Sequence, residues 1–168
     1  MMTKCVDLSD PVYGKIEEVI RKTYAQSCIL WIEEVDNKEL KSKFDTYVES
    51  LPEPNIRRLF HGTNEIAMDN IIRYGFDPLR NTRSMYGKGV YFARDARYSK
   101  NYLVSNREGI AFMLVCDVAL GKSSVGEAHK PISGDSAVDS LKNPSIFVVD
   151  KVNAVYPKYV VAFYPKAR

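Results

Sequence analysis

The chain of 168 residues has the length of one ordinary domain, and 45% of its residues are hydrophobic, a composition typical of packed globular proteins and unlike that of disordered or collagen-like chains. Its 24 basic and 21 acidic residues are spread along the sequence and give a formal charge of +3, so no basic stripe of the kind that follows a phosphate backbone is visible. Binding to nucleic acid is therefore unsupported, although the composition does not exclude it.

Neither a membrane span nor a secretory signal is visible in the sequence. No segment approaches the roughly 18 consecutive apolar residues of a membrane-spanning helix, and the N-terminal segment lacks the apolar core of a signal peptide. Cys5, Cys28 and Cys116 are far apart and lack the spacing of zinc ligands. We therefore expect one intracellular domain over residues 1–168, cytoplasmic or nuclear, monomeric, without a metal and with reduced thiols.

The first part of the chain predicts two amphipathic helices with a strand between them. Asp10 and Pro11 predict the start of the first helix, because a polar cap followed by proline at the first helical position is typical of helix N-termini. Residues 28–35, "CILWIEEV", predict a strand. Asp36, with Glu39 three residues later, predicts the N-terminus of the second helix.

The middle of the chain predicts a strand followed by a helix. Residues 56–63, "IRRLFHGT", predict the strand, and the helix is expected from Thr63 to Tyr74 with Gly75 as its left-handed terminator. The apolar side chains that we expect to point inward from this helix are Ile66, Met68, Ile71 and Ile72.

The remaining strands lie in the second half of the sequence. After a polar loop, residues 90–94 predict a strand, and Asp95 predicts the start of a short helix. Three further strand candidates cover residues 109–120, 145–150 and 159–164. Residues 121–144 are rich in Gly, Ser and Pro, so we expect one long polar loop, of the kind that is usually functional or disordered.

This order of elements predicts an α+β fold with a largely antiparallel sheet, because the strands are concentrated in the second half and the helices mostly in the first. The glycines of "YGKGVY" precede their strand, whereas a dinucleotide fingerprint places glycines after a strand and opens a helix with them. A Walker loop is also not expected, since the Gly-Lys pair lacks the required lead.

His61 is the first candidate for chemistry. It lies in "FHGT" at the end of an apolar strand, next to Gly62, where the backbone lets a ligand approach closely. Two interpretations stay open at this point: a hydrogen-bonded core histidine, or a residue that contacts a ligand. The other histidine, His129, lies in the polar segment and is expected to be a surface residue.

A cluster of tyrosines follows the glycines of "YGKGVYFARDARYSKNYL". Tyr98 and Tyr102 are four residues apart and would share a helical face, while Tyr91 lies on the strand before them. Any one ring taken alone is more simply explained as core. Together with the Ser99 hydroxyl and glycines that permit close approach, however, the rings suit a planar carboxamide such as nicotinamide.

Four motifs, "FHGT", "YGKGVYFA", "YSKNY" and "VYPKYVV", resemble in order and spacing the catalytic domain of the poly(ADP-ribose) polymerase family. The resemblance covers nearly the whole chain, and the N-terminal helices and strand are similar to those of the compact mono-ADP-ribosyltransferase members. It implies a split, mostly antiparallel sheet and NAD⁺ as co-substrate. It also implies that the long helical regulatory region of the polymer-forming members is absent ahead of "FHGT".

The resemblance assigns roles to individual residues. His61 would contact the adenosine-side ribose of NAD⁺, and the Gly62 backbone and Ser99 would bind the nicotinamide carboxamide. Tyr91 and Tyr102 would lie on the two faces of the nicotinamide ring. The remaining residues expected at the NAD⁺ site are Thr63, Phe92, Ala93 and Tyr98.

The resemblance also implies a departure from the family pattern at Lys158. The polymer-forming members carry a glutamate before the tyrosine of the last strand, and "YPKYVV" places Lys158 there. An ammonium has no acceptor for a ribose hydroxyl. A cation about 5 Å from an oxocarbenium-like ribose would cost about 3 kcal/mol at an effective dielectric of about 20, or about 100-fold in rate.

We therefore predict a mono-ADP-ribosyltransferase with His61, Tyr91 and Lys158 as its catalytic positions. The acceptor is expected to be a protein, this chain included, and a thiol, carboxylate, serine or nucleic-acid end stays open as the acceptor group. Two alternatives remain: a non-catalytic NAD⁺ or ADP-ribose binding module, and an interaction domain with a filled pocket. By the resemblance, residues 121–144 shape the choice of acceptor.

Overall fold

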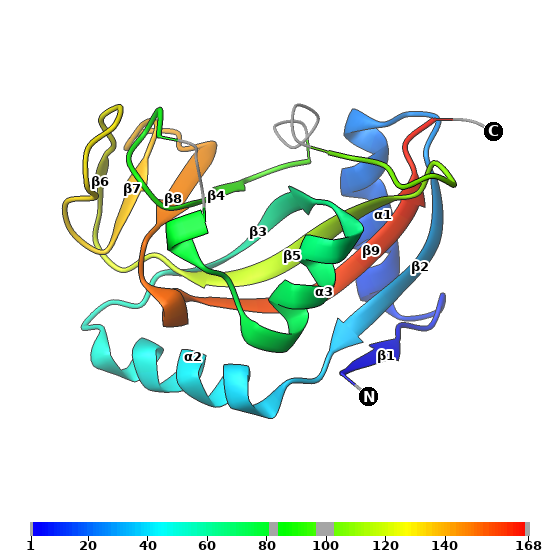
Figure 1. Ribbon diagram of the computed structural model, residues 1–168, viewed down its shortest axis with the longest axis horizontal. Helices are drawn as coiled ribbons and strands as arrows, with labels where there is room; N and C mark the ends of the chain where they lie inside the picture. Colours follow the sequence, from blue (N-terminus) through cyan, green and yellow to red (C-terminus); the bar gives the residue numbers. More distant parts are fainter. Residues whose placement is uncertain (1, 81–83, 97–102, 167–168) are drawn as a thin grey trace.

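In the computed structural model, which describes residues 2–80, 84–96 and 103–166, the centre of the molecule is a nine-stranded sheet (Figure 1). The strand order is β1-β2-β9-β5-β3-β4-β8-β7-β6, and all neighbours are antiparallel except β6 and β7. The strands are β1 (Thr3–Cys5), β2 (Cys28–Val35), β3 (Ile56–Thr63), β4 (Val90–Ala93), β5 (Ala111–Ala119), β6 (Ser123–Val125), β7 (Ser136–Val138), β8 (Ile146–Val149) and β9 (Val155–Tyr164). The α+β fold with a mostly antiparallel sheet is confirmed.

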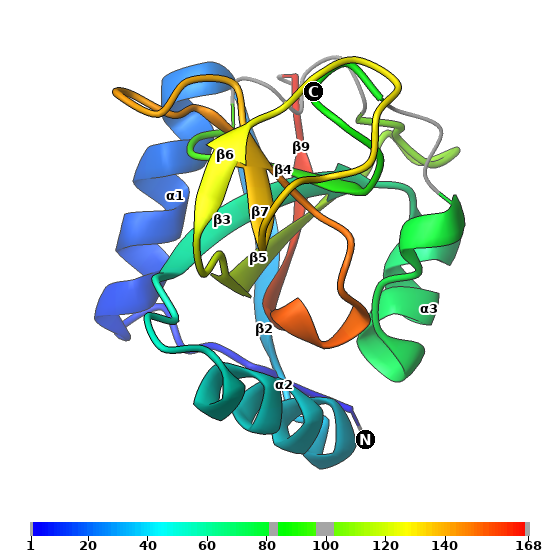
Figure 2. The same cartoon turned by 90° about the vertical axis from the view of Figure 1, so that its left-hand side faces the viewer.

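Three α-helices and two short 3₁₀ helices, counted over the described ranges, cover this sheet (Figure 2). They are α1 (Pro11–Thr23), α2 (Lys38–Ser50), α3 (Glu65–Tyr74), η1 (Pro78–Arg80) and η3 (Val152–Ala154). Helix α1 lies on the opposite side of the sheet from α3, with the long strands between them. The predicted start of α1 is confirmed, because the Asp10 carboxylate accepts a hydrogen bond from the Val12 amide at 3.0 Å.

The alternation of side chains along β5 builds a core on each face of the sheet. Met113 and Val115 pack with the α1 side chains Ile16 and Ile20, whereas Leu114 packs with the group that contains Ile72 of α3. Because β5 is buried on both faces, it reads as a continuous apolar run rather than as an alternating one. Strand β5 is therefore the rigid centre from which β3 and its histidine are positioned.

The start of α2 differs from the prediction. Asn37, not Asp36, is the capping residue, and its side-chain oxygen accepts from the Leu40 amide at 3.1 Å. The same side chain is buried and donates to the Ile72 carbonyl at 2.9 Å, so it joins the start of α2 to the end of α3. Sequence spacing alone favoured Asp36, because the spacing does not reveal the tertiary contact between Asn37 and Ile72.

The orientation of α3 also departs in part from the prediction. Ile72 is buried, and Met68 and Ile71 pack against the core, but Ile66 is 78% exposed and does not point inward. Asn64 caps the helix through the Ala67 amide at 2.8 Å, and Gly75 ends it with φ of 86°. The predicted terminator is therefore confirmed.

The prediction of one long loop over residues 121–144 is wrong. The segment contains β6 and β7, which pair in parallel, and all three residues of β7 are buried. Ser136 is buried, and its hydroxyl shares a 2.7 Å hydrogen bond with the Ser123 hydroxyl. This bond offsets the free-energy cost of burying a polar group. Strand β1 was not predicted either, since three mostly exposed residues carry no clear period.

No helix within the described ranges is both long enough and apolar enough to cross a membrane.

Candidate active site

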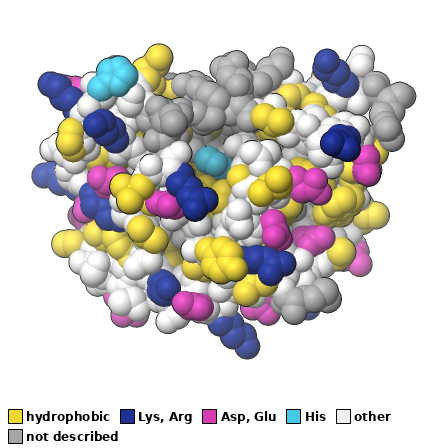
Figure 3. Space-filling view, viewed as in Figure 1, with side chains coloured by type: hydrophobic (Ala, Val, Ile, Leu, Met, Phe, Trp, Pro, Cys, Tyr) yellow, Lys and Arg dark blue, Asp and Glu magenta, His cyan; other side chains and the backbone are white. Residues whose placement is uncertain are grey.

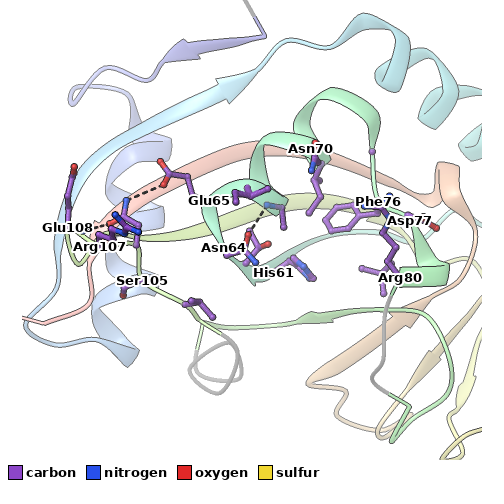
Figure 4. A pocket seen from close by; sticks show the side chains of 18 residues that line it. His61, Asn64, Glu65, Asn70, Phe76, Asp77, Arg80, Ser105, Arg107 and Glu108 are labelled. Atoms are coloured by element: carbon purple, nitrogen blue, oxygen red, sulfur yellow. Dashed lines mark hydrogen bonds and ion pairs between the residues drawn. The ribbon is translucent and has the colours of Figure 1, made fainter.

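A cavity of about 1040 Å³ lies over the end of β3, between α3 and residues 104–108 (Figure 4). Its volume suits an extended small molecule. His61 points into its middle, with Phe76 and Arg80 at one end and Arg107 and Glu108 at the other. In the space-filling view, a histidine side chain is visible within a hollow of this face (Figure 3).

The sheet opens beside this cavity. Strand β3 pairs with β5 along its whole length, but its described pairing with β4 consists of Phe60 and Ala93 alone. If that register continued, Gly62 would lie opposite Tyr91. Instead the two strands diverge, and a split sheet with an accessible backbone edge at Gly62 results.

The His61 ring bridges the diverging strands. Its Nδ1 lies 2.8 Å from the Tyr91 carbonyl oxygen. Because a carbonyl can only accept, Nδ1 carries the hydrogen, and Nε2 of the neutral ring is then an acceptor. The ring meets Phe76 edge-on, with 5.0 Å between centroids, and lies 5.4 Å from Phe92, so its orientation is fixed by packing as well.

Tyr91 lies on β4 but is not among the described residues that line the cavity. Its side chain is only 4% exposed and packs with Ala137 and Ile146. Its hydroxyl donates to the Gly87 carbonyl at 2.6 Å and accepts from the Tyr86 amide at 2.8 Å. Tyr91 is thus a core residue as well as a neighbour of His61 through its backbone carbonyl.

The two glycines before β4 make close contacts with the protein itself. A Cβ on Gly89 would lie 2.5 Å from the Val149 carbonyl oxygen of β8. Gly87 has φ of 110°, and a Cβ there would lie 3.3 Å from the Ile132 side chain. These glycines therefore allow β4 and its turn to pack against neighbouring backbone, rather than shaping space for a ligand.

Lys158 does not lie with His61. It lines a second cavity of about 670 Å³ bounded by α2, β1 and β2, where its Nζ lies 2.8 Å from Glu34 Oε1. Hydrogen bonding to Glu34 raises the pKa of Lys158, although burial partly opposes this. The expected place of Lys158 beside the reacting ribose is therefore not supported.

A β-bulge lies at Lys158 itself. Tyr159 pairs with Val115 and Pro157 with Cys116, so Lys158 is an extra residue in β9 that has no partner in β5. Such bulges re-aim a side chain and break the regular alternation of a strand. The sequence spacing could not show this.

The other predicted residues are distributed unevenly. Thr63 lines the cavity, and Gly62 lies between it and His61 on β3. Phe92 and Ala93 are buried on β4, and Phe92 packs against His61. Tyr98, Ser99 and Tyr102, together with most of the short helix expected from Asp95, lie outside the described residues.

Several cavity residues were missed by the sequence analysis. Phe76 follows the end of α3 and packs its ring against His61, and Asn106 caps the turn before β5 by accepting from the Ile110 amide at 3.0 Å. Their signals, a buried aromatic residue after a helix-ending glycine and an Asn in a polar turn, are too common to single out a site.

Ile146 is a further residue that the sequence did not reveal. It opens β8, pairs with Ala93 and packs against Tyr91. Its amide donates to Asp139 at 3.2 Å, as does the Ser145 amide at 3.0 Å. Burial alone would raise the pKa of Asp139, but these hydrogen bonds and one from the Ser145 hydroxyl outweigh burial and lower it. The ionised carboxylate therefore fixes the start of β8 beside Tyr91.

Metal ligands do not gather in the part of the chain that the structure describes: it contains no group of three or more His, Cys, Asp or Glu side chains suited to a metal ion.

The fold and cavity together define an α+β protein with a split sheet, in which a fixed histidine faces an extended cavity. The model of the poly(ADP-ribose) polymerase catalytic domain matches residues 12–142, more than half of the chain. The chain therefore belongs to the poly(ADP-ribose) polymerase catalytic-domain family.

The chain is also similar to curated relatives with this domain. Human protein mono-ADP-ribosyltransferase PARP12 is 32% identical over 174 residues, covering 92% of this chain and 24% of PARP12. Mouse protein mono-ADP-ribosyltransferase PARP11 is 29% identical over 189 residues, covering 90% of this chain and 57% of PARP11. A probable poly [ADP-ribose] polymerase of Dictyostelium discoideum is 32% identical over 169 residues, covering 92% of this chain and 50% of that protein. The chain thus spans between about a quarter and just over half of these relatives.

Proposed function

We propose that this chain cleaves NAD⁺ and transfers a single ADP-ribose to a protein acceptor, which can be another copy of the chain. The observation that carries the proposal is the orientation of His61. Within a domain of this family, its Nδ1–H is bound to the Tyr91 carbonyl and its ring faces a cavity large enough for a dinucleotide. In the neutral ring, Nε2 can accept a hydrogen bond from a ribose hydroxyl.

The proposed site holds the nicotinamide end of NAD⁺ by hydrogen bonds and ring contacts. The Gly62 backbone, exposed where β3 and β4 diverge, pairs with the nicotinamide carboxamide, and Ser99 adds a second hydrogen bond. Tyr91 and Tyr102 confine the nicotinamide ring, with Phe92, Ala93 and Tyr98 behind them and Thr63 beside the ribose. NAD⁺ is the co-substrate, and the chemistry needs no metal.

In the proposed reaction, the bond between the ribose C1″ and the nicotinamide nitrogen breaks, and its electron pair stays on nicotinamide, which leaves as a neutral molecule. The ribose becomes oxocarbenium-like, by analogy with glycoside cleavage. The acceptor's nucleophilic atom then bonds to C1″ and loses its proton, if it carries one, to solvent or to a neighbouring group of the acceptor. An acceptor that is already ionised, such as a carboxylate, needs no enzyme base.

The surroundings of Tyr91 support transfer of one unit rather than chains. Ile146 and Ala137 pack against this tyrosine, and their apolar side chains cannot activate a hydroxyl of a growing polymer. Lys158, which the sequence motif placed at the glutamate position, is paired with Glu34 in the second cavity. The same observation favours the alternative, a module that binds NAD⁺ or ADP-ribose without turnover.

Measurement of nicotinamide release and of label transfer from ³²P-labelled NAD⁺ tests the proposal. We expect nicotinamide release and a single sharp labelled band, on the chain itself or on a protein of an added cell extract. Treatment with protease or nuclease identifies a protein or a nucleic-acid acceptor. Long ladders would contradict single transfer, and saturable NAD⁺ binding without nicotinamide release would establish the binding module instead.

A further inference from the structure

Residues 126–132, which we call the clasp segment, lie against the turn that leads into β4. The His129 amide donates to the Ser84 carbonyl at 2.7 Å, and the Ser84 hydroxyl and His129 Nδ1 share a hydrogen bond of 2.6 Å. The Lys88 amide donates to the Lys130 carbonyl at 3.1 Å. Three hydrogen bonds thus connect two segments about forty positions apart in the sequence, although most residues of the clasp segment are exposed.

The approach of these two segments depends on a glycine. A Cβ on Gly126 would lie 1.8 Å from the Tyr86 carbonyl oxygen, far inside any contact distance. His129 holds a left-handed backbone, with φ of 63°, which is uncommon for a residue with a side chain. A strained histidine and an obligatory glycine within four positions indicate that this contact is closely defined.

The turn held by the clasp segment leads into β4, the strand that carries Tyr91. The Tyr91 hydroxyl bonds to the Gly87 carbonyl and the Tyr86 amide, which lie inside this turn. Ile132 of the clasp segment packs against the same cluster as the Tyr91 ring. The backbone carbonyl of Tyr91 in turn fixes the His61 tautomer. A continuous chain of contacts therefore runs from His129 through the turn to His61.

We propose that the clasp segment is a positioning element for the NAD⁺ site, with Gly126 and His129 as its positioning residues. The inference rests on the proposed function. Residues 121–144 are expected to face the acceptor. An acceptor that displaces the clasp segment would therefore alter how Tyr91 and His61 hold NAD⁺. Neither Gly126 nor His129 lines the His61 cavity, so each acts through Tyr91 and not on the substrate.

Hydrogen exchange and steady-state kinetics of four variants test this inference. In His129→Ala and Gly126→Ala, the Tyr86 and Lys88 amides should exchange about 5-fold faster or more, as expected for loss of about one hydrogen bond. The KM for NAD⁺ should rise by a similar factor, because the ring walls and His61 lose their fixed positions. Compared with His129→Ala, His129→Asn should restore much of the exchange protection and of the wild-type KM. Asparagine tolerates a left-handed backbone and keeps a side-chain acceptor.

Lys130→Ala is the matched control. Lys130 lies in the same segment, and the substitution removes a side chain whose ion-pair partner among the described residues is Glu127, while the carbonyl that binds Lys88 remains. It should leave both readouts at the wild-type level. Unchanged exchange at Tyr86 and Lys88 in His129→Ala and Gly126→Ala, or faster exchange with an unchanged KM, would overturn the inference.

The two proposals fail in different ways. If the wild-type chain neither releases nicotinamide nor binds NAD⁺, the proposed function fails. Exchange at Tyr86 and Lys88 then still decides whether the clasp segment holds the Tyr91 turn, because that measurement requires no substrate.

Discussion

Two cavities flank the same sheet, and each contains one residue that the sequence motifs assigned to a common site. The His61 cavity has a histidine held by backbone and ring contacts. The Lys158 cavity has an ammonium held by a carboxylate, among charged side chains of both signs that include Lys41 and Asp45. The comparison teaches that motif order locates strands reliably, whereas the direction of a single side chain depends on local strand geometry.

The largest expected effect is that of a substitution at His61, and it distinguishes the role of the His61 cavity from that of the Lys158 cavity. His61→Ala removes the acceptor for a ribose hydroxyl and should lower kcat/KM for nicotinamide release by about 10-fold to 100-fold, since an unpaired polar group at a binding site costs about 1–3 kcal/mol. The melting temperature should change little, because His61 is only partly buried. Collapse of the fold in this variant would instead identify His61 as a structural core histidine.

Tyr91 should behave differently from His61, because its side chain belongs to the core. Tyr91→Ala leaves a cavity between β4 and β8 and should lower the free energy of unfolding by about 3–5 kcal/mol. Tyr91→Phe keeps the ring but leaves the Tyr86 amide and the Gly87 carbonyl unpaired, and should cost about 1–2 kcal/mol. Urea denaturation measures both.

The informative result is whether Tyr91→Ala lowers the free energy of unfolding more than Tyr91→Phe does. If Tyr91→Ala retained wild-type stability while losing activity, Tyr91 would be a ligand wall without a packing role. That outcome would contradict the hydrogen bonds and burial described for Tyr91.

The sequence predicted the long elements well, for reasons that the structure makes plain. Strand β3 and helix α1 have local signals, an apolar run bounded by turns and a proline-marked start, that suffice to define them. Strand β7 was missed because its three residues are buried only through pairing with β6 and β8, contacts that local polarity cannot reveal. Elements that owe their burial to distant partners are hidden from a single sequence.

The candidate site was predictable to a similar extent. His61 could be chosen because an apolar strand, a histidine and a glycine stand together in "FHGT". Lys158 could not be placed, because its expected position rested on a motif match, which does not show that Lys158 is a bulged residue in β9 paired with Glu34. The packing of Tyr91 against Ile146 likewise arises from the pairing of β4 with β8, which no local motif encodes.

The smallest expected effect concerns Lys158 itself. Lys158→Met keeps the apolar stem, removes the ammonium, and should change kcat/KM for nicotinamide release by less than about 2-fold, because the pair with Glu34 lies in the other cavity. A 100-fold rise in rate would instead restore the ribose-side position that the sequence suggested.

The pH dependence of stability provides an independent check on the same pair. The pKa of Lys158 is raised by its hydrogen bond to Glu34, so the folded protein holds this proton more tightly than the unfolded chain does. The resulting stabilisation, about 0.5 kcal/mol for a partly exposed pair, is fully present below the unfolded pKa of about 10.4 and is lost as the pH rises through the folded pKa. Urea midpoints at pH 8 and pH 11 should therefore differ more for the wild type than for Lys158→Met. Equal differences would mean that Lys158 and Glu34 are not coupled in solution, and the assignment of Lys158 to the second cavity would lose its energetic support.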